Sequence, residues 1–225
     1  MTDALLFDPA SAAIVVGGSA LATVLRAGFT DLAATGRALA CLRHRRFSAT
    51  RARADLAAQV REIRQDGLLR ADPAHSGDSE LDEATDALLE RRSIAALLDR
   101  HEAHKARRQA CARAAVATLA QSAELAPVFG LAGTLVSLSR LPAGGLEQGA
   151  FAGAISMAVL TTLYGLLLAN LVLAPLARIV DRHAQAEEAE RQTVIDWLAY
   201  QVGPMCREGG KGDPQRRDDS RDIAA

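Results

Sequence analysis

The feature that most constrains this chain is the long uncharged run from Gly149 to Ala177. About twenty apolar residues are enough to cross a bilayer as a helix, and this run is long enough to cross with tilt. It also contains Thr161, Thr162 and Pro175. Polar groups at membrane depth are costly, and they usually face a bundle interior or an ion path. The run therefore predicts a membrane helix and indicates a role in transport.

The composition excludes some function classes. Apolar residues make up 49% of the chain and charged residues 24%, a mixture that suits soluble and membrane proteins alike. The formal net charge of −1 argues against binding driven by phosphate neutralisation, and aromatic residues, at 4%, are too few for stacking platforms. We therefore expect no nucleic-acid partner. Charges cluster between Arg37 and Arg113 and again after Arg178.

Two further windows are nearly free of charge. The first runs from Pro9 to Leu25 and follows Asp8, a good helix N-cap. A signal peptide or a soluble core helix is the alternative reading of this window, although a signal peptide normally begins with basic residues. The second runs from Leu125 to Leu138, with an apolar extension before Glu124. A short segment that contains proline and glycine separates this second window from the uncharged run that begins at Gly149. Such a short turn between two spans predicts an antiparallel helical hairpin.

Basic residues near the span ends predict the orientation. They follow the first window, precede the second and follow the third. This pattern places the N-terminus and the hairpin tip outside, and the large loop and the C-terminus inside, in a multi-pass membrane protein. The three scattered cysteines, Cys41, Cys111 and Cys206, then lie on the cytoplasmic side, where thiols stay reduced.

The predicted fold is an all-α integral membrane protein with three transmembrane helices, two of them extended into a cytoplasmic helical stalk. In sequence order, we expect a periplasmic N-terminus (1–8), a transmembrane helix (9–29), a cytoplasmic helical region (30–113), a stalk end with a transmembrane helix (114–140), a periplasmic turn (141–148), a transmembrane helix (149–179), a cytoplasmic helix (180–207) and a disordered tail (208–225).

The cytoplasmic region shows helical spacing at Leu56, Val60 and Ile63. We expect the helix that starts at Ser79 to run without a break into the second span. His101 and His104 have a spacing that can bind a metal, but Lys105, Arg107 and Arg108 follow them and repel cations. We interpret this stretch as a solvated helix face. No nucleophile–base pair, metal set or phosphate-binding loop stands out, so we expect no enzyme activity, metal or cofactor.

Several intramembrane residues are candidates for function. Pro127 and Pro175 each remove a helix hydrogen bond and predict a kink or hinge. Glu124 is either an interfacial residue that reaches the membrane surface or a member of an ion path. Thr134 lies on nearly the same helix face as Pro127 and would face Thr161 and Thr162 across the hairpin, although membrane threonines often only bond to their own helix. Small residues predict close helix packing at Gly17, Gly18, Gly130, Gly133, Gly165 and Ala169. Thr161, Gly165 and Ala169 follow one another at a spacing of four, which predicts a ridge of small residues on one helix face.

These segments resemble a known family. The stretches AELAPVFGLAGTLVSL (123–138) and AVLTTLYGLLLANLVLAPLARIVD (158–181) are similar to the last two membrane helices of the MotA/TolQ/ExbB proton-channel family. The motifs GTL and TTLYG look most like flagellar motor stator A-subunits of the sodium-type branch. IVVGGS (14–19) and REIRQDGLLRAD (61–72) resemble the second membrane helix and the start of the cytoplasmic region of those subunits.

The resemblance implies an ion-conducting stator subunit that couples proton or sodium flow to mechanical work, most directly flagellar rotation. It implies a homo-oligomeric ring, a pentamer, around a single-span B-type subunit (MotB-, ExbD- or TolR-like) that carries the ion-binding aspartate. By position, Thr134 and Thr162 match hydroxyls of the ion path, with Thr161 and Glu124 beside them, and Pro127 and Pro175 match coupling prolines. Arg64 and Asp72 fall near charges that contact the flagellar rotor protein.

The chain also departs from the stator pattern. Its similarity starts at the second stator helix, so it apparently lacks the first. Three spans with an outside N-terminus is the topology of the ExbB and TolQ branch, which energises envelope transport. That branch remains an alternative, as does a non-conducting membrane scaffold.

Overall fold

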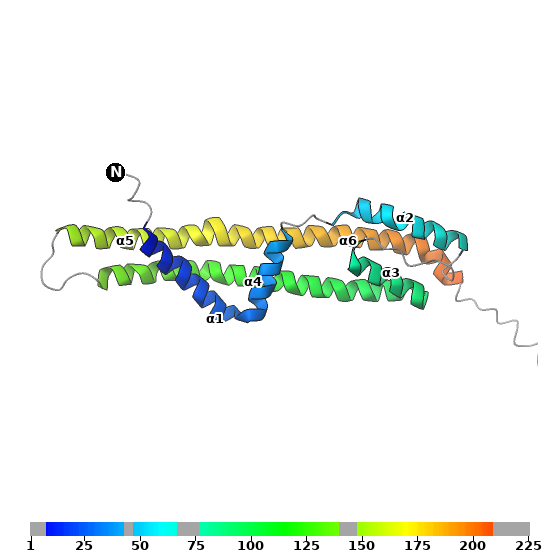
Figure 1. Cartoon of the computed structure of the whole chain (residues 1–225), viewed down its shortest axis with the longest axis horizontal. Helices are drawn as coiled ribbons and strands as arrows, with labels where there is room; N and C mark the ends of the chain where they lie inside the picture. The colour runs from blue at the N-terminus through cyan, green and yellow to red at the C-terminus, as the bar shows by residue number, and fades with distance from the viewer. Residues whose placement is uncertain (1–7, 43–46, 67–76, 140–147, 209–225) are drawn as a thin grey trace, which may run out of the picture. The chain divides into compact units, whose positions relative to one another are not determined.

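Every regular element of the described part of this chain is a helix. The computed structural model describes residues 8–42, 47–66, 77–139 and 148–208. They form α1 (Pro9–Cys41), α2 (Ala49–Asp66), α3 (Ser79–Arg91), α4 (Ile94–Ser139), α5 (Gln148–Leu167), the π-helix η2 (Leu168–Leu173) and α6 (Ala174–Glu208), in the order drawn in Figure 1. Three helical stretches, Pro9–Cys41, Ile94–Ser139 and Phe151–Cys206, are long and apolar enough to cross a membrane. The predicted all-α class with three candidate spans is confirmed.

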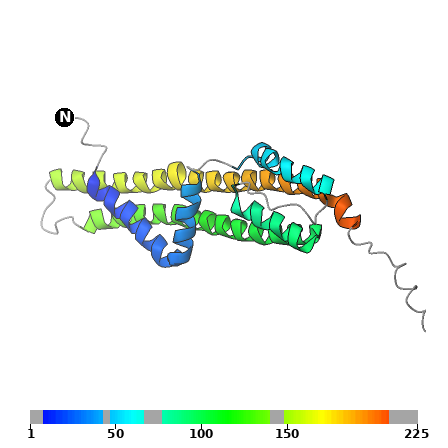
Figure 2. The same ribbon diagram turned by 45° about the vertical axis from the view of Figure 1, so that its right-hand side comes forward.

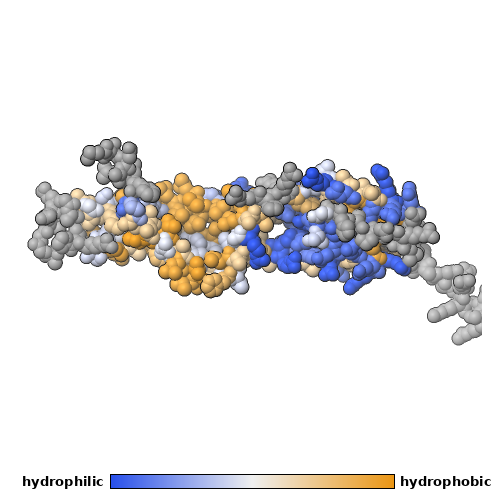
Figure 3. All heavy atoms as spheres, in the orientation of Figure 1, coloured by the Kyte–Doolittle hydropathy of each residue, from blue (hydrophilic) through white to orange (hydrophobic). Residues whose placement is uncertain are grey.

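The chain divides into two units. Unit 1 comprises Met1–Arg45 and Gln109–Gln185, and unit 2 comprises Arg46–Arg108 and Ala186–Ala225. In unit 1, α1 lies across α4 and α5 in both ribbon views (Figures 1 and 2). In unit 2, α2 lies along α6 and α3 along α4. Figure 3 shows apolar residues gathered over the helices of unit 1, and hydrophilic residues over those of unit 2.

Helix α1 begins where the sequence predicts and bends where the predicted span ends. The carboxylate of Asp8 accepts hydrogen bonds from the backbone N–H groups of Ala10 and Ser11. Gly28 has a φ of 74° and a ψ of 169°, so two helical segments meet there at a kink. This backbone conformation is essentially restricted to glycine. The predicted boundary at residue 29 therefore coincides with a bend and not with the end of the helix.

The second and third spans both continue as helices beyond their apolar stretches, as predicted. Helix α4 is 46 residues long, and α5, η2 and α6 follow one another without a break in helical structure. The prediction of an unbroken helix from Ser79 into the second span is wrong. Helix α3 ends at Arg91, and Arg92 adopts a left-handed conformation with a φ of 50° before α4 begins. A left-handed residue is a common helix stop, and here it is not glycine.

The core of unit 2 combines the predicted stripe of α2 with apolar residues of three other helices. Leu56, Val60 and Ile63 of α2 are buried with Leu81 and Leu88 of α3. The remaining helices contribute Leu97 of α4 and Val194, Ile195, Leu198 and Val202 of α6. The period of about 3.6 residues on each helix thus produces one shared apolar interior.

Candidate functional site

Helices α4 and α5 approach each other closely because glycines line their contact, which we call the α4–α5 seam. A β-carbon added at Gly133 would lie 2.8 Å from the Cβ and Cγ2 atoms of Thr161. One added at Gly130 would lie 3.0 Å from the Thr161 carbonyl oxygen. Glycine removes the side chain that would otherwise keep the two backbones apart.

On the α5 side of the seam, Gly165 faces backbone atoms of α4. A β-carbon at Gly165 would lie 2.7 Å from the carbonyl oxygen of Ala126 and 3.2 Å from the Cα of Pro127. As α4 proceeds from Ala126 to Gly133, its neighbours on α5 therefore run backwards from Gly165 to Thr161. This register is the antiparallel hairpin that the sequence predicts. The predicted ridge of Thr161, Gly165 and Ala169 is buried throughout.

The three predicted hydroxyls differ in exposure. Thr161 is fully buried, whereas Thr134 and Thr162 are half-buried. Each hydroxyl donates to a carbonyl oxygen of its own helix: Thr161 and Thr162 to Ala158 at 2.9 and 3.2 Å, and Thr134 to Leu131 at 2.6 Å. A hydroxyl that donates its proton to a backbone carbonyl can still accept a hydrogen bond or bind a cation through its oxygen lone pairs. Thr134 and Thr162 can therefore present acceptor oxygens to a cation, while Thr161 fills the space left by Gly133.

Pro175 follows a widened helical turn. Residues Leu168–Leu173 form a π-helix, and the N–H of Ala174 donates to the carbonyl of Ala169. Asn170 donates its side-chain amide to Leu166 at 3.0 Å. A proline cannot supply the backbone donor of a regular helix, and a π-turn is one way to accommodate this loss. The helix therefore continues through Pro175 with altered hydrogen bonding. Such short π-helices are frequent at functional sites.

Other predicted membrane residues are placed differently. Glu124 is exposed on α4, one turn before Pro127. Gly18 packs against the Phe129 ring, because an added β-carbon would clash with that ring, whereas a β-carbon added at Gly17 would meet nothing within 4 Å. Gly18 is therefore a contact point between α1 and α4, and the close approach at this position does not extend to Gly17.

A buried hydroxyl pair between α1 and α4 was not singled out from the sequence. The hydroxyls of Thr23 and Ser122 lie 3.0 Å apart and are both buried. Thr23 also bonds to the carbonyl of Ser19, and Ser122 to that of Thr118. The signal was available, because each helix carries hydroxyl residues four positions apart. Interhelical hydroxyl pairs of this kind stabilise membrane helix packing modestly.

The candidate rotor residues can be placed only in part. Arg64 is exposed near the C-terminal end of α2 and donates to the side chain of Gln201. Asp72 lies outside the described residues, as do most of the predicted N-terminal segment, the hairpin turn before 148 and the tail from 209.

The interpretation of His101 and His104 as a solvated face is wrong. Both side chains are buried, at 5% and 8% exposure. His101 lies 3.6 Å from Glu188, and His104 lies 3.1 Å from Glu83. Burial lowers the pKa of His101, more than its contacts with Gln192 and Glu188 raise it. No set of three or more metal-ligating side chains occurs within the described ranges.

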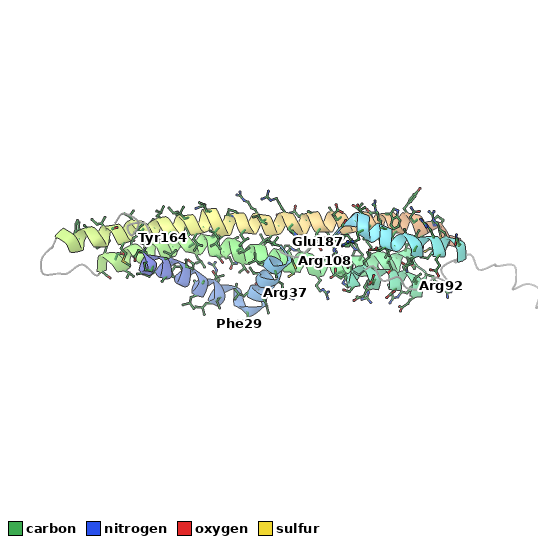
Figure 4. All side chains as sticks on the ribbon, turned by 45° about the horizontal axis from the view of Figure 1, so that its top comes forward. Phe29, Arg37, Arg92, Arg108, Tyr164 and Glu187 are labelled. Atoms are coloured by element: carbon green, nitrogen blue, oxygen red, sulfur yellow. The ribbon has the colours of Figure 1, made fainter. Side chains whose placement is uncertain are left out.

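The same part of unit 2 contains a network of ion pairs that the sequence analysis missed. Arg191 lies 2.8 Å from Asp78 and 3.1 Å from Glu187, with its guanidinium over the Phe47 ring. Arg108 bonds to Glu80 and lies 2.9 Å from Glu188. Figure 4 labels Arg108 and Glu187 among the side chains. Burial alone would raise the pKa of Asp78, but Arg191 and two backbone N–H groups lower it. Glu187 precedes Arg191 by four residues on α6, a spacing that the sequence shows, whereas Asp78, and both partners of Arg108, come from segments far away in the sequence.

Comparison with known proteins identifies the family. The family model described as "MotA/TolQ/ExbB proton channel family" matches residues 63–193, which include the whole α4–α5 seam. The chain belongs to this family. Motility protein A of Borreliella burgdorferi is 37% identical over 86 residues, which cover 38% of this chain and 33% of that protein. The chemotaxis protein PomA of Vibrio alginolyticus is 35% identical over 85 residues, 37% of this chain and 34% of that protein.

Solved structures of relatives share the fold. The flagellar MotAB stator complex from Bacillus subtilis has a chain that matches with a TM-score of 0.75 at 19% identity, over 92% of this chain and 83% of that chain. The C. jejuni MotAB structure matches with a TM-score of 0.76 at 18% identity, over 90% and 81%. The sequence matches span about a third of the length of the two curated relatives.

Proposed function

We propose that this chain is the ion-conducting subunit of a stator complex, which converts proton or sodium flow into mechanical work and most directly into flagellar rotation. The observation that carries the proposal is the α4–α5 seam, where the half-buried Thr162 lies at the Gly130 contact and Thr134 directly follows Gly133, inside the segment matched by the proton-channel family. The names of the relatives, a motility protein and a chemotaxis protein, favour rotation.

The ion path needs oxygen ligands and a group that can hold charge. Thr134 and Thr162 supply hydroxyl oxygens whose protons are already bonded to backbone carbonyls. Such oxygens can replace part of the hydration shell of a cation, but they cannot neutralise its charge. Glu124, exposed on α4 of the single chain, is either an interfacial residue or a further member of this path. The ion also needs a carboxylate that balances its charge. We assign it to an aspartate of a single-span B-type subunit, surrounded by a ring of five copies of this chain.

The two prolines offer a route from ion passage to movement. Pro127 sits in the seam beside Gly165, and Pro175 follows the π-helix. Helices α4 and α6 each continue along the chain from these prolines into residues of unit 2. A change in bending at either proline would therefore be passed along a continuous helix. In this account unit 2 lies in the cytoplasm, the N-terminus lies in the periplasm, and Arg64 and Asp72 contact the rotor.

The experiment co-expresses the chain with a single-span partner that carries a membrane aspartate, in a motile bacterium that lacks its own stator. We expect swimming from the unaltered chain. Thr162→Leu should abolish swimming, because it replaces the hydroxyl oxygen with a bulky apolar group. The complex should still co-purify, because the residue that packs against Gly133 is Thr161. Retained swimming in Thr162→Leu would contradict the assignment. Restoration of envelope transport without rotation would place the chain in the energising branch instead.

A further inference from the structure

Helix α1 changes direction at Gly28, and its second segment packs against the middle of α4 and the first turns of α6. Ala38, Leu39 and Leu42 pack against a cluster formed by Ala115, Leu119, Ala177 and Val180. In both ribbon views this segment turns across α4 towards α6 (Figures 1 and 2). Phe29, directly after the kink, is 83% exposed and is labelled in Figure 4. The packed cluster thus marks one level along the three helices.

Exposed arginines gather at this level. Each helix leaves its apolar stretch at an arginine: Arg26 on α1, Arg113 on α4 and Arg178 on α6. Arg37 and Arg182 follow within the next few turns and are exposed as well. Arg37 directly precedes Ala38, Arg113 lies two residues before Ala115, and Arg178 directly follows Ala177. The arginines therefore flank the same apolar cluster.

These arginines have no anionic partner in the described part of the chain. No carboxylate of a described residue lies within 4.0 Å of any of the five, in contrast to Arg108 and Arg191 of unit 2. The Nε atoms of Arg37, Arg113 and Arg182 donate to backbone carbonyls of their own helices. This anchoring leaves the two terminal nitrogens of each guanidinium free to bind an anion from outside. A guanidinium fork matches phosphate geometry.

We propose that Arg37, Arg113, Arg178 and Arg182 form a binding surface for the phosphate headgroups of anionic phospholipids at the cytoplasmic edge of unit 1. The proposal rests on membrane insertion of unit 1 and is independent of ion conduction. Juxtamembrane arginines are attracted to anionic lipid surfaces. The apolar side chains beside them complete the match, because a lipid carries acyl chains next to its phosphate. Leu25 is 78% exposed next to Arg26, and Ile179 is exposed next to Arg178.

Fewer acidic than basic residues lie near this surface, so the arginine charges are not neutralised within the described part of unit 1. Asp31 lies at the start of the second segment of α1, just after the kink at Gly28. Asp181 on α6 accepts a hydrogen bond from Gln185. The local excess of positive charge is therefore left for an external anion. A lipid surface fits better than a small soluble anion, since the arginines stand on three separate helices around an apolar cluster and not within one enclosed pocket.

The test measures lipid retention by the full chain. Purified protein is equilibrated with mixed micelles of a neutral detergent that contain equal amounts of phosphatidylglycerol and phosphatidylcholine, washed, and analysed for bound lipid by mass spectrometry. The unaltered chain should retain phosphatidylglycerol preferentially. Replacing Arg37, Arg113, Arg178 and Arg182 by Gln should lower the retained ratio by at least about fivefold, which is the preference that a single arginine near an anionic surface contributes. The same four positions changed to Lys should keep most of the preference.

Two controls make the result decisive. The first replaces four exposed arginines of unit 2, Arg51, Arg61, Arg91 and Arg100, by Gln, which removes the same charge elsewhere and should leave the ratio unchanged. The second adds soluble glycerol phosphate, which should compete poorly. An equal loss of preference in the unit 2 control, or displacement of the lipid by soluble glycerol phosphate, would overturn the proposal. So would loss of preference in the Lys variant with normal helical content.

Discussion

Gly165 packs directly against the backbone of Ala126, because a β-carbon at position 165 would lie 2.7 Å from the Ala126 carbonyl oxygen. Real β-carbons essentially never approach so closely, and a backbone carbonyl cannot rotate away as a side chain can. Gly165→Ala must therefore push α5 away from α4. We expect a destabilisation of about 1–3 kcal/mol, measured by thermal unfolding of the full chain in detergent.

A second glycine on the same helix provides the control. Gly153 has nothing within 4 Å of an added β-carbon, so Gly153→Ala should raise the stability by up to about 1 kcal/mol through helix propensity alone. Equal effects of the two substitutions would mean that the close α4–α5 contact does not exist.

The kink at Gly28 makes a different prediction, which concerns backbone strain. Its φ of 74° and ψ of 169° lie in a region that other residues avoid, although an added β-carbon would meet no atom within 4 Å. Gly28→Ala should cost about 1–3 kcal/mol in thermal unfolding. Gly36→Ala, in the helical segment beyond the kink, is equally unobstructed and should be neutral or stabilising. A neutral Gly28→Ala would indicate that α1 runs straight through position 28.

The Arg191 network should contribute strongly to the stability of unit 2. Arg191→Met takes the guanidinium away from Asp78 and Glu187 at a place where the Arg191 side chain is only 13% exposed, which should cost about 3 kcal/mol. Arg107→Met is the matched control, because Arg107 is 75% exposed and its ion pair among the described residues is a 3.4 Å contact with Glu80. This variant should change stability by less than about 1 kcal/mol. Fluorescence of Trp197, the one tryptophan of the chain, follows the unfolding of unit 2. Similar losses in both variants would contradict the ranking.

Burial of His101 makes the stability of unit 2 depend on pH. The pKa of its imidazole is lower in the folded chain than in the unfolded chain, because burial disfavours the charged ring. Below about pH 6.5 the unfolded chain therefore binds more protons, and stability falls as the pH drops through that value. The loss between about pH 7.5 and about pH 5.5 should be smaller in His101→Gln than in the unaltered chain. An equal or larger loss in the variant would contradict the assignment.

Much of this fold is local and was therefore readable from the sequence. Uncharged runs and the Asp8 cap fixed the membrane helices, and the spacing of Leu56, Val60 and Ile63 fixed a buried face. The failures were of two kinds. First, α3 ends because Arg92 adopts a left-handed conformation. Glycine is the usual residue at such a helix end, so an arginine there gives no sequence signal. Second, His101, His104 and Arg108 have partners on other helices, and so does Arg191 in its contact with Asp78. Sequence spacing along one helix cannot reveal such pairs.

The candidate site divides in the same way. Thr161, Gly165 and Ala169 were predicted as a packed ridge because small residues at a spacing of four form one helix face. The roles of the individual threonines were not predictable, since only the pairing of Gly133 with Thr161 separates the buried hydroxyl from the half-buried ones. The Thr23–Ser122 pair joins two helices that are distant in the sequence. No local pattern sets which of their hydroxyls meet.

Ion flux through reconstituted vesicles tests the central claim most directly. The chain is reconstituted with a single-span partner that carries a membrane aspartate, and proton and sodium entry are followed with fluorescent indicators under an imposed membrane potential. We predict flux of one of these cations that requires both subunits, persists in Gly153→Ala and is lost in Thr162→Leu. Vesicles that contain the intact complex but pass neither cation, or Thr162→Leu vesicles that conduct as well as the unaltered ones, would contradict the account.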